Sequence, residues 1–127
     1  FQGDNVEYYY TFTFFLENIT LLLFFLILLR MKKVASQFAL KKYFTVENAK
    51  NIRFIGWLVI STFIIQDLII ESIFPLFHTI SATEYEPNIV KLIIHMTYKL
   101  FIGIFLLSIG KAFELGLKQQ QENELTI

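Results

Sequence analysis

Residues 10–29 are YTFTFFLENITLLLFFLILL, an apolar run in which Glu17 is the single charged side chain. A helix needs about 20 such residues to cross a hydrocarbon layer roughly 30 Å thick, because each residue advances it by about 1.5 Å. The run therefore predicts a membrane-spanning helix. It has no basic flank before it and no small-residue cleavage site after it, so we expect it to remain in the mature protein.

Two further apolar runs follow, at about residues 54–77 and 89–113. The chain is 55% hydrophobic and contains 15 Phe. These residues cluster in runs instead of recurring at amphipathic spacing, which indicates that lipid covers them. We therefore predict an all-α fold, an integral membrane helical bundle of three visible transmembrane helices that form one domain over residues 1–127.

Charge is distributed unevenly between the loops. The loop at residues 30–53 contains one acidic residue, Glu47. Its basic residues are Arg30, Lys32, Lys33, Lys41, Lys42, Lys50 and Arg53. The positive-inside rule then places this loop and the tail, residues 114–127, in the cytoplasm. These cations are expected to set topology and contact lipid headgroups, while binding of nucleic acid or of one specific anionic lipid is the alternative.

The same rule places the amino terminus outside the cell. Because the chain has no targeting segment, we expect a further span before residue 1. Residues 1–3, Phe-Gln-Gly, also match the end of a common protease-cleavage tag.

The basic loop also carries local helix signals. Apolar residues from Val34 to Phe38 predict a short helix on the membrane surface, over residues 34–43. Thr45 has the character of an N-cap, and Glu47 would lie in the first turn of the helix that it starts. We expect that helix to continue directly into the second span.

The second and third runs contain opposite charges. Asp67 and Glu71 lie four residues apart in one run, and Lys91, His95 and Lys99 have the same spacing in the other. Each ionisable group costs about 2.5–3.5 kcal/mol in hydrocarbon, so these groups require partners. The two spans must be antiparallel neighbours, and residue counting then pairs Asp67 with Lys99 and Glu71 with His95. We expect Glu17, at a similar depth, to join them in one buried cluster.

This cluster has two interpretations. The first is structural: the pairs hold the helices together and fix their register, since lipid gives no hydrophobic drive for helix association. The second is a proton or ion path in which His95 is a relay. We assign no catalytic, cofactor-binding or metal-ligating residues, because one His with scattered acids gives too few ligands and no Ser has an evident base.

Two short motifs resemble a known family. The ending Glu122-Asn123-Glu124-Leu125-Thr126-Ile127 is similar to an "ENDLTV"-like motif of the bacterial family known as domain of unknown function 2975. Phe44-Thr45-Val46-Glu47-Asn48, followed by Ile52-Arg53-Phe54-Ile55-Gly56, resembles that family's other recurring stretch. The resemblance implies a small bacterial inner-membrane protein with four spans, often encoded beside a helix-turn-helix regulator. It implies no activity and no cofactor.

The functional prediction is a non-enzymatic membrane protein that binds or regulates a partner through its cytoplasmic loop and tail. The expected partners are membrane lipid and a cytoplasmic regulator or other membrane subunits, with homo-oligomers allowed and no direct nucleic acid contact. The residues assigned to the partner surface are Phe44, Thr45, Glu47, Asn48, Glu122, Asn123, Glu124, Leu125 and Thr126. The alternatives are a small transporter or proton-coupled channel that uses Asp67, Glu71, His95 and Lys99, and an accessory subunit of a larger membrane complex.

Overall fold

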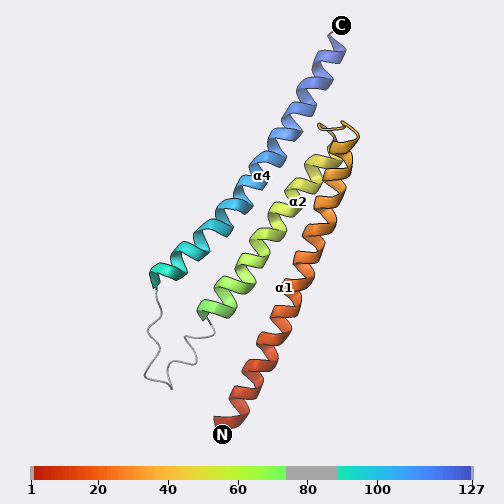
Figure 1. Ribbon diagram of the computed structural model, residues 1–127. Helices are drawn as coiled ribbons and strands as arrows, with labels where there is room; N and C mark the ends of the chain where they lie inside the picture. The colour runs from red at the N-terminus through yellow and green to blue at the C-terminus, as the bar shows by residue number, and fades with distance from the viewer. Residues whose placement is uncertain (1, 74–88, 127) are drawn as a thin grey trace.

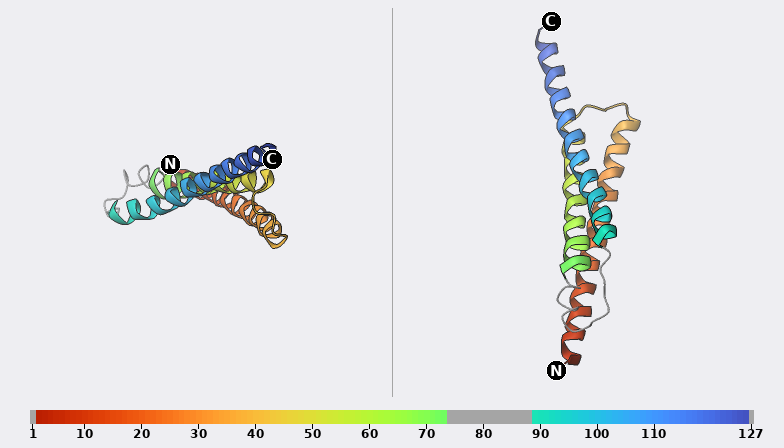
Figure 2. Two further views of the ribbon diagram at one scale, coloured as in Figure 1. Left: turned by 90° about the horizontal axis from the view of Figure 1, so that it is seen from above. Right: turned by 90° about the vertical axis from the view of Figure 1, so that its left-hand side faces the viewer.

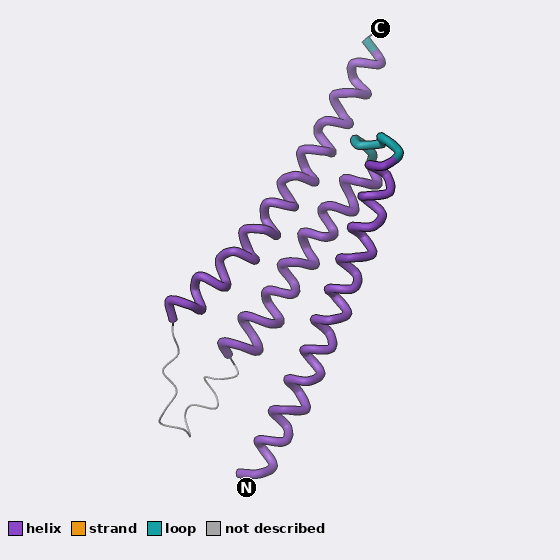
Figure 3. Tube along the Cα trace, viewed as in Figure 1, coloured by secondary structure: helices purple, strands orange, loops and turns teal. Residues whose placement is uncertain are grey.

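The computed structural model describes residues 2–73 and 89–126, and this part of the chain is helical with no strand. Its elements are α1 (Gln2–Ala39), α2 (Val46–Phe63), the π-helix η1 (Ile64–Ile73) and α4 (Ile89–Leu125). α1, the continuous segment of α2 and η1, and α4 run antiparallel in turn, and α2 lies between α1 and α4 (Figures 1 and 3). Within these described residues, three helical segments are long and apolar enough to cross a membrane: Tyr10–Ala39, Val46–Ile70 and Met96–Leu125. The all-helical, three-span prediction is confirmed.

The close contact between α2 and α4 depends on glycine. A Cβ added to Gly103 would lie 2.5 Å from Ile60 Cγ1, and one added to Gly56 would lie 3.1 Å from the Gly103 carbonyl oxygen. A Cβ at Gly110 would collide with the Arg53 side chain. Small residues let two backbones approach closely, which strengthens van der Waals contact where lipid supplies no hydrophobic drive. Gly103 and Gly110 thus both lie where α4 approaches α2 closely.

The contact between α1 and α2 is made by aliphatic side chains. Ile27 of α1 is buried with Ile55 and Leu58 of α2, and Leu23 and Val34 pack around this cluster. Most other large apolar side chains of α1 are exposed, as a lipid-facing helix requires. Viewed from above, α1 diverges from the other two helices (Figure 2).

The turn after α1 is a Schellman motif. Lys42 N–H donates to the Gln37 carbonyl at 3.0 Å, and Lys41 N–H donates to the Phe38 carbonyl at 2.9 Å. Lys41 has a φ of 57°, the left-handed position that glycine usually occupies in this motif. These bonds satisfy carbonyl groups that the end of a helix leaves open.

Two elements differ from the sequence-based prediction. First, α1 continues to Ala39, so residues 34–39 extend the first helix and do not form a separate surface helix. Nothing between residues 30 and 39 breaks a helix, and the basic residues there are good helix formers. Second, α2 passes directly into the π-helix η1, which the apolar pattern does not predict. Pro75 and the rest of residues 74–88 lie outside the described residues.

Candidate functional site

A buried ion pair joins η1 to α4. Lys99 Nζ donates to Asp67 Oδ1 at 3.0 Å, and Asp67 is 0% exposed. Lys99 is mostly covered, with 19% of its side chain exposed. Counting residues along two antiparallel spans predicts this pairing, and the structure contains it.

The pair can do two things physically. It fixes how η1 and α4 align, because displacement by one turn would leave two charges unpaired in an apolar environment. It also places a carboxylate and an ammonium within proton-transfer distance. The π-helix around Asp67 is relevant to the second role, since π-helical turns are rare and frequently occur at functional sites.

The π-helix removes the α-helical spacing from which Asp67 and Glu71 were predicted to share one face. In an α-helix, residues four apart share a face, and this spacing placed Asp67 and Glu71 together. A π-helix bonds each residue to the fifth one along, so its repeat is longer and α-helical counting does not hold across η1. The pairing of Glu71 with His95 stays a prediction, because the side chains of Glu71, Lys91 and His95 lie outside the described residues.

Glu17 does not join the buried pair. Its side chain is exposed on α1, and it forms no ion pair with the described residues. Depth along the membrane normal was the basis of the prediction, but depth does not specify which way a helix turns its side chains. The prediction that Glu17 joins the buried cluster is therefore wrong.

The Phe44–Asn48 motif builds the turn that precedes α2. Thr45 is the N-cap, as predicted, and its hydroxyl oxygen accepts from Asn48 N–H at 3.1 Å. Asn48 Nδ2 donates to the carbonyl groups of Lys42 and Tyr43 at 2.8 and 2.9 Å. Asn48 is 0% exposed, so its assignment to a partner surface is wrong. Its side chain is buried within the turn because a tight turn leaves backbone carbonyl groups that require hydrogen-bond donors.

Phe44 and Glu47, the other two residues of that motif assigned to the partner surface, remain accessible. Phe44 is exposed and its ring lies 5.1 Å from the ring of Phe113 on α4. Phe38 of α1 stacks on Phe113 at 6.2 Å. Glu47 is exposed in the first turn of α2 and accepts from Gln37 Nε2 at 3.3 Å. The rings of Phe38, Phe44 and Phe113 connect α1 and the α1–α2 turn to α4 at one end of the bundle. We name this end, where the α1–α2 turn lies, the inner end.

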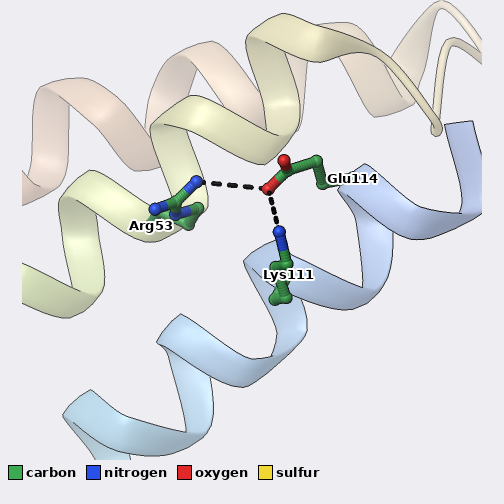
Figure 4. A network of polar contacts seen from close by, with 3 residues as sticks. All are labelled: Arg53, Lys111 and Glu114. Carbon is green, nitrogen blue, oxygen red and sulfur yellow. Dashed lines mark hydrogen bonds and ion pairs between the residues drawn. The ribbon is translucent and has the colours of Figure 1, made fainter. Parts of the chain in front are cut away.

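A second set of polar contacts reinforces the inner end. Glu114 Oε2 lies 3.2 Å from Arg53 Nη1 and 3.2 Å from Lys111 Nζ (Figure 4). All three side chains are about half exposed, so solvent screening keeps each contact worth no more than about 1 kcal/mol. Between α1 and α2 at the same end, Arg30 Nη1 donates to Asn51 Oδ1 at 2.9 Å, and its guanidinium lies 4.7 Å from the centre of the Phe54 ring.

The predicted tail surface lies on the last turns of α4. The side chains of Glu122, Asn123, Glu124, Leu125 and Thr126 are all exposed. The Thr126 hydroxyl donates to the Glu122 carbonyl at 2.6 Å and so satisfies a carbonyl group at the end of α4. We name residues 118–125 the α4 extension. It projects beyond the α1–α2 turn in Figure 1.

A groove at the inner end was not predicted from the sequence. It has a volume of about 540 Å³ and is lined by one face of α1 and by Glu47 of α2. Its basic residues are Arg30, Lys32 and Lys33. The sequence predicts that these cations set topology and contact lipid headgroups, with nucleic acid or one specific anionic lipid as the alternative. Leu26, Arg30, Lys33 and Gln37 also recur at helical spacing, which indicates one shared face.

No three His, Cys, Asp or Glu side chains in residues 2–73 and 89–126 are grouped so that they could hold a metal ion. The described residues form three apolar helices and an intramembrane ion pair. This arrangement defines the class of protein, a small helical membrane protein with a charged contact between two spans.

The family follows from comparison with known proteins. The model of the family described as "Protein of unknown function (DUF2975)" matches residues 2–127, and the chain therefore belongs to that family. The resemblance noted in the two short motifs is thus confirmed over essentially the whole chain. No curated protein and no solved structure matches the sequence.

Proposed function

We propose that this chain is a non-enzymatic membrane protein that binds a partner at its inner end, through the turn before α2 and the α4 extension. The observation that supports the proposal is the projection of α4 beyond the α1–α2 turn (Figure 1). A Cβ added to Gly116 would lie 3.4 Å from Phe44, and the side chains of residues 118–126 are exposed.

The chemistry of the extension suits a protein partner. Every side chain of residues 118–125 is exposed, and most helical stability in proteins comes from tertiary packing, so these turns gain stability when a second surface covers them. The extension presents Leu125, which is 88% exposed, between acidic and amide side chains. The exposed Phe44 ring lies beside the start of the extension and adds an aromatic anchor. A helix that offers a few apolar anchors among polar groups is a common recognition element.

The proposed partner is a cytoplasmic regulator. The basic loop favours a cytoplasmic inner end under the positive-inside rule. The family resemblance adds a helix-turn-helix regulator as the partner class. The proposed location is the bacterial inner membrane, with the carboxyl terminus in the cytoplasm.

Photo-crosslinking in native membranes tests this proposal. A benzophenone amino acid at Gln121 should give an adduct with a soluble DNA-binding protein, and that same protein should co-purify with the full chain. A matched probe at Leu21, an exposed position within the first span, should not capture it. Removing residues 119–127 should abolish the co-purification. The proposal fails if every soluble partner is retained without those residues.

A second candidate function rests on the π-helix. A small transporter or proton-coupled channel is supported by the burial of Asp67 within η1 and by its contact with Lys99. In proteoliposomes, Asp67→Asn together with His95→Gln should then abolish proton flux. Flux that survives both substitutions excludes this path.

A further inference from the structure

The groove at the inner end combines apolar and basic walls. Leu26 and Leu29 line it on the side of the first span, and Arg30, Lys32 and Lys33 follow within one turn of α1. Ser36 and Gln37 add hydroxyl and amide groups farther along the same helix. A single groove therefore changes from hydrocarbon-like to cationic along the direction of α1. This gradient matches a glycerophospholipid, whose acyl chains join a charged headgroup.

Within the described part of the chain, the cations of the groove form no ion pair with an acidic side chain. The basic residues of α2 and α4 include four in ion pairs: Arg53 and Lys111 with Glu114, Lys99 with Asp67, and Lys118 with Glu122. No such ion pair includes Arg30, Lys32 or Lys33 among the residues that the structure describes. The carboxylate of Glu47 also lines the groove, and it accepts a hydrogen bond from Gln37. Three cations against one carboxylate leave the wall with an excess of positive charge.

Arg30 is held in place before any ligand arrives. Asn51, which is 2% exposed, accepts from its Nη1, and the Phe54 ring lies under the guanidinium. Arg30 is only partly exposed and uses neutral groups for these contacts, so its charge is not cancelled. A fixed guanidinium is well suited to bind a phosphate, because its N–H groups match the spacing of the phosphate oxygens. The volume of about 540 Å³ lies within the usual range for small-molecule sites.

We propose that this groove binds the headgroup of one anionic phospholipid. The phosphate contacts Arg30, Lys32 and Lys33, and an acyl chain lies along Leu26 and Leu29. The excess positive charge disfavours a zwitterionic lipid such as phosphatidylcholine. Glu47 accepts a hydrogen bond from a headgroup hydroxyl, which favours a hydroxyl-bearing headgroup such as that of phosphatidylglycerol.

Native mass spectrometry of the full chain in mild detergent tests the proposal. With equal amounts of phosphatidylglycerol and phosphatidylcholine, we expect one phosphatidylglycerol to remain bound per chain after collisional activation. Lys32→Gln with Lys33→Gln should weaken that binding roughly tenfold or more, since each basic residue contributes to attraction for anionic lipid. The matched control, Lys41→Gln with Lys42→Gln, removes the same charge from the adjacent turn and should change the affinity less than twofold.

Three results would overturn the proposal. Equal weakening by both double variants would mean that the cations act as a general basic surface. Equal retention of phosphatidylcholine would exclude selection by charge. Displacement of the lipid by soluble glycerol phosphate would assign the groove to a free phosphate ester. Spin-labelled phosphatidylglycerol and phosphatidylcholine give a check on the unmodified protein, which should immobilise a larger fraction of the anionic lipid.

Discussion

The two faces of α2 are built from different chemistry. Toward α4 the contact is close and polar, with Gly56 and Gly103 at the backbone approach and the Asp67–Lys99 ion pair beside it. Toward α1 the contact is aliphatic, centred on Ile27, and it is closed at the inner end by the Arg30–Asn51 hydrogen bond.

The two faces therefore contribute differently: the α4 face determines how the helices align, and the α1 face adds packing that depends less on alignment. Aliphatic side chains pack as well against lipid as against a helix, so the α1 face gains mainly from local fit. The α4 face contains groups that have one good arrangement, because a stranded charge or a misplaced Cβ is costly. We therefore expect α2 with η1 and α4 to form the rigid unit of the molecule, with α1 attached less strongly.

The largest effect is expected at the ion pair. Lys99→Met removes the cation that contacts the buried Asp67 and should lower the free energy of unfolding by about 3–5 kcal/mol. Adding Asp67→Asn should restore much of that loss, because the amide is neutral. SDS titration of the micellar protein, followed by circular dichroism, gives both values. A double variant no more stable than Lys99→Met would contradict the role assigned to the pair.

The next effect tests the glycine contact by comparing two positions on α4. Gly103→Ala should destabilise by about 1–3 kcal/mol, because its Cβ would lie 2.5 Å from Ile60 Cγ1. Gly116→Ala meets Phe44 at 3.4 Å, an ordinary contact, and should stabilise the helix by about 0.5–1 kcal/mol. The same SDS titration measures both variants. Equal effects at the two glycines would show that close approach does not define the α2–α4 contact.

A smaller loss is expected on the other face of α2. Ile27→Ala should cost about 1–2 kcal/mol, because packing contacts are lost while lipid cancels the hydrophobic transfer term. Leu28→Ala, on the exposed side of the same helix, is the matched control and should have almost no effect. Spin labels on α1 and α2 would report any separation of the helices. A loss at Ile27 as large as that at Lys99 would remove the distinction between the two faces.

The smallest effect is expected in the turn that joins α1 to α2. Lys41→Gly relieves the left-handed backbone at a φ of 57° and should stabilise by about 0.5–1 kcal/mol. Lys42→Gly, at the next residue, should destabilise slightly because it only adds freedom to the unfolded chain. Thermal unfolding in one detergent compares the two. A gain at Lys42 equal to that at Lys41 would show that the turn is not strained.

Much of the fold could be predicted because its causes are local. The apolar runs predict the spans, and the oxygen of Thr45 predicts where α2 begins. The Asp67–Lys99 pair could also be predicted, since an antiparallel pair of spans brings opposite charges of equal depth together. Each of these inferences needs only residue type and spacing.

The remaining features depend on information that spacing does not contain. The π-helix shifts hydrogen bonds by one residue without changing which residues are apolar. The end of a lipid-facing run is not the end of a helix, so α1 continues to Ala39 through its basic residues. Asn48 is polar but buried, because the turn needs its amide, and Glu17 is exposed because depth does not determine orientation.

The separation of Asp67 and Lys99 by 32 residues also has a consequence for synthesis at the ribosome. At about 5–20 residues per second, Asp67 is made about 2–6 seconds before the lysine that neutralises it. During that interval the second span contains a carboxylate with no cation from the third. Release into lipid is therefore expected to wait for Lys99, so that η1 and α4 leave the insertion machinery together as a hairpin.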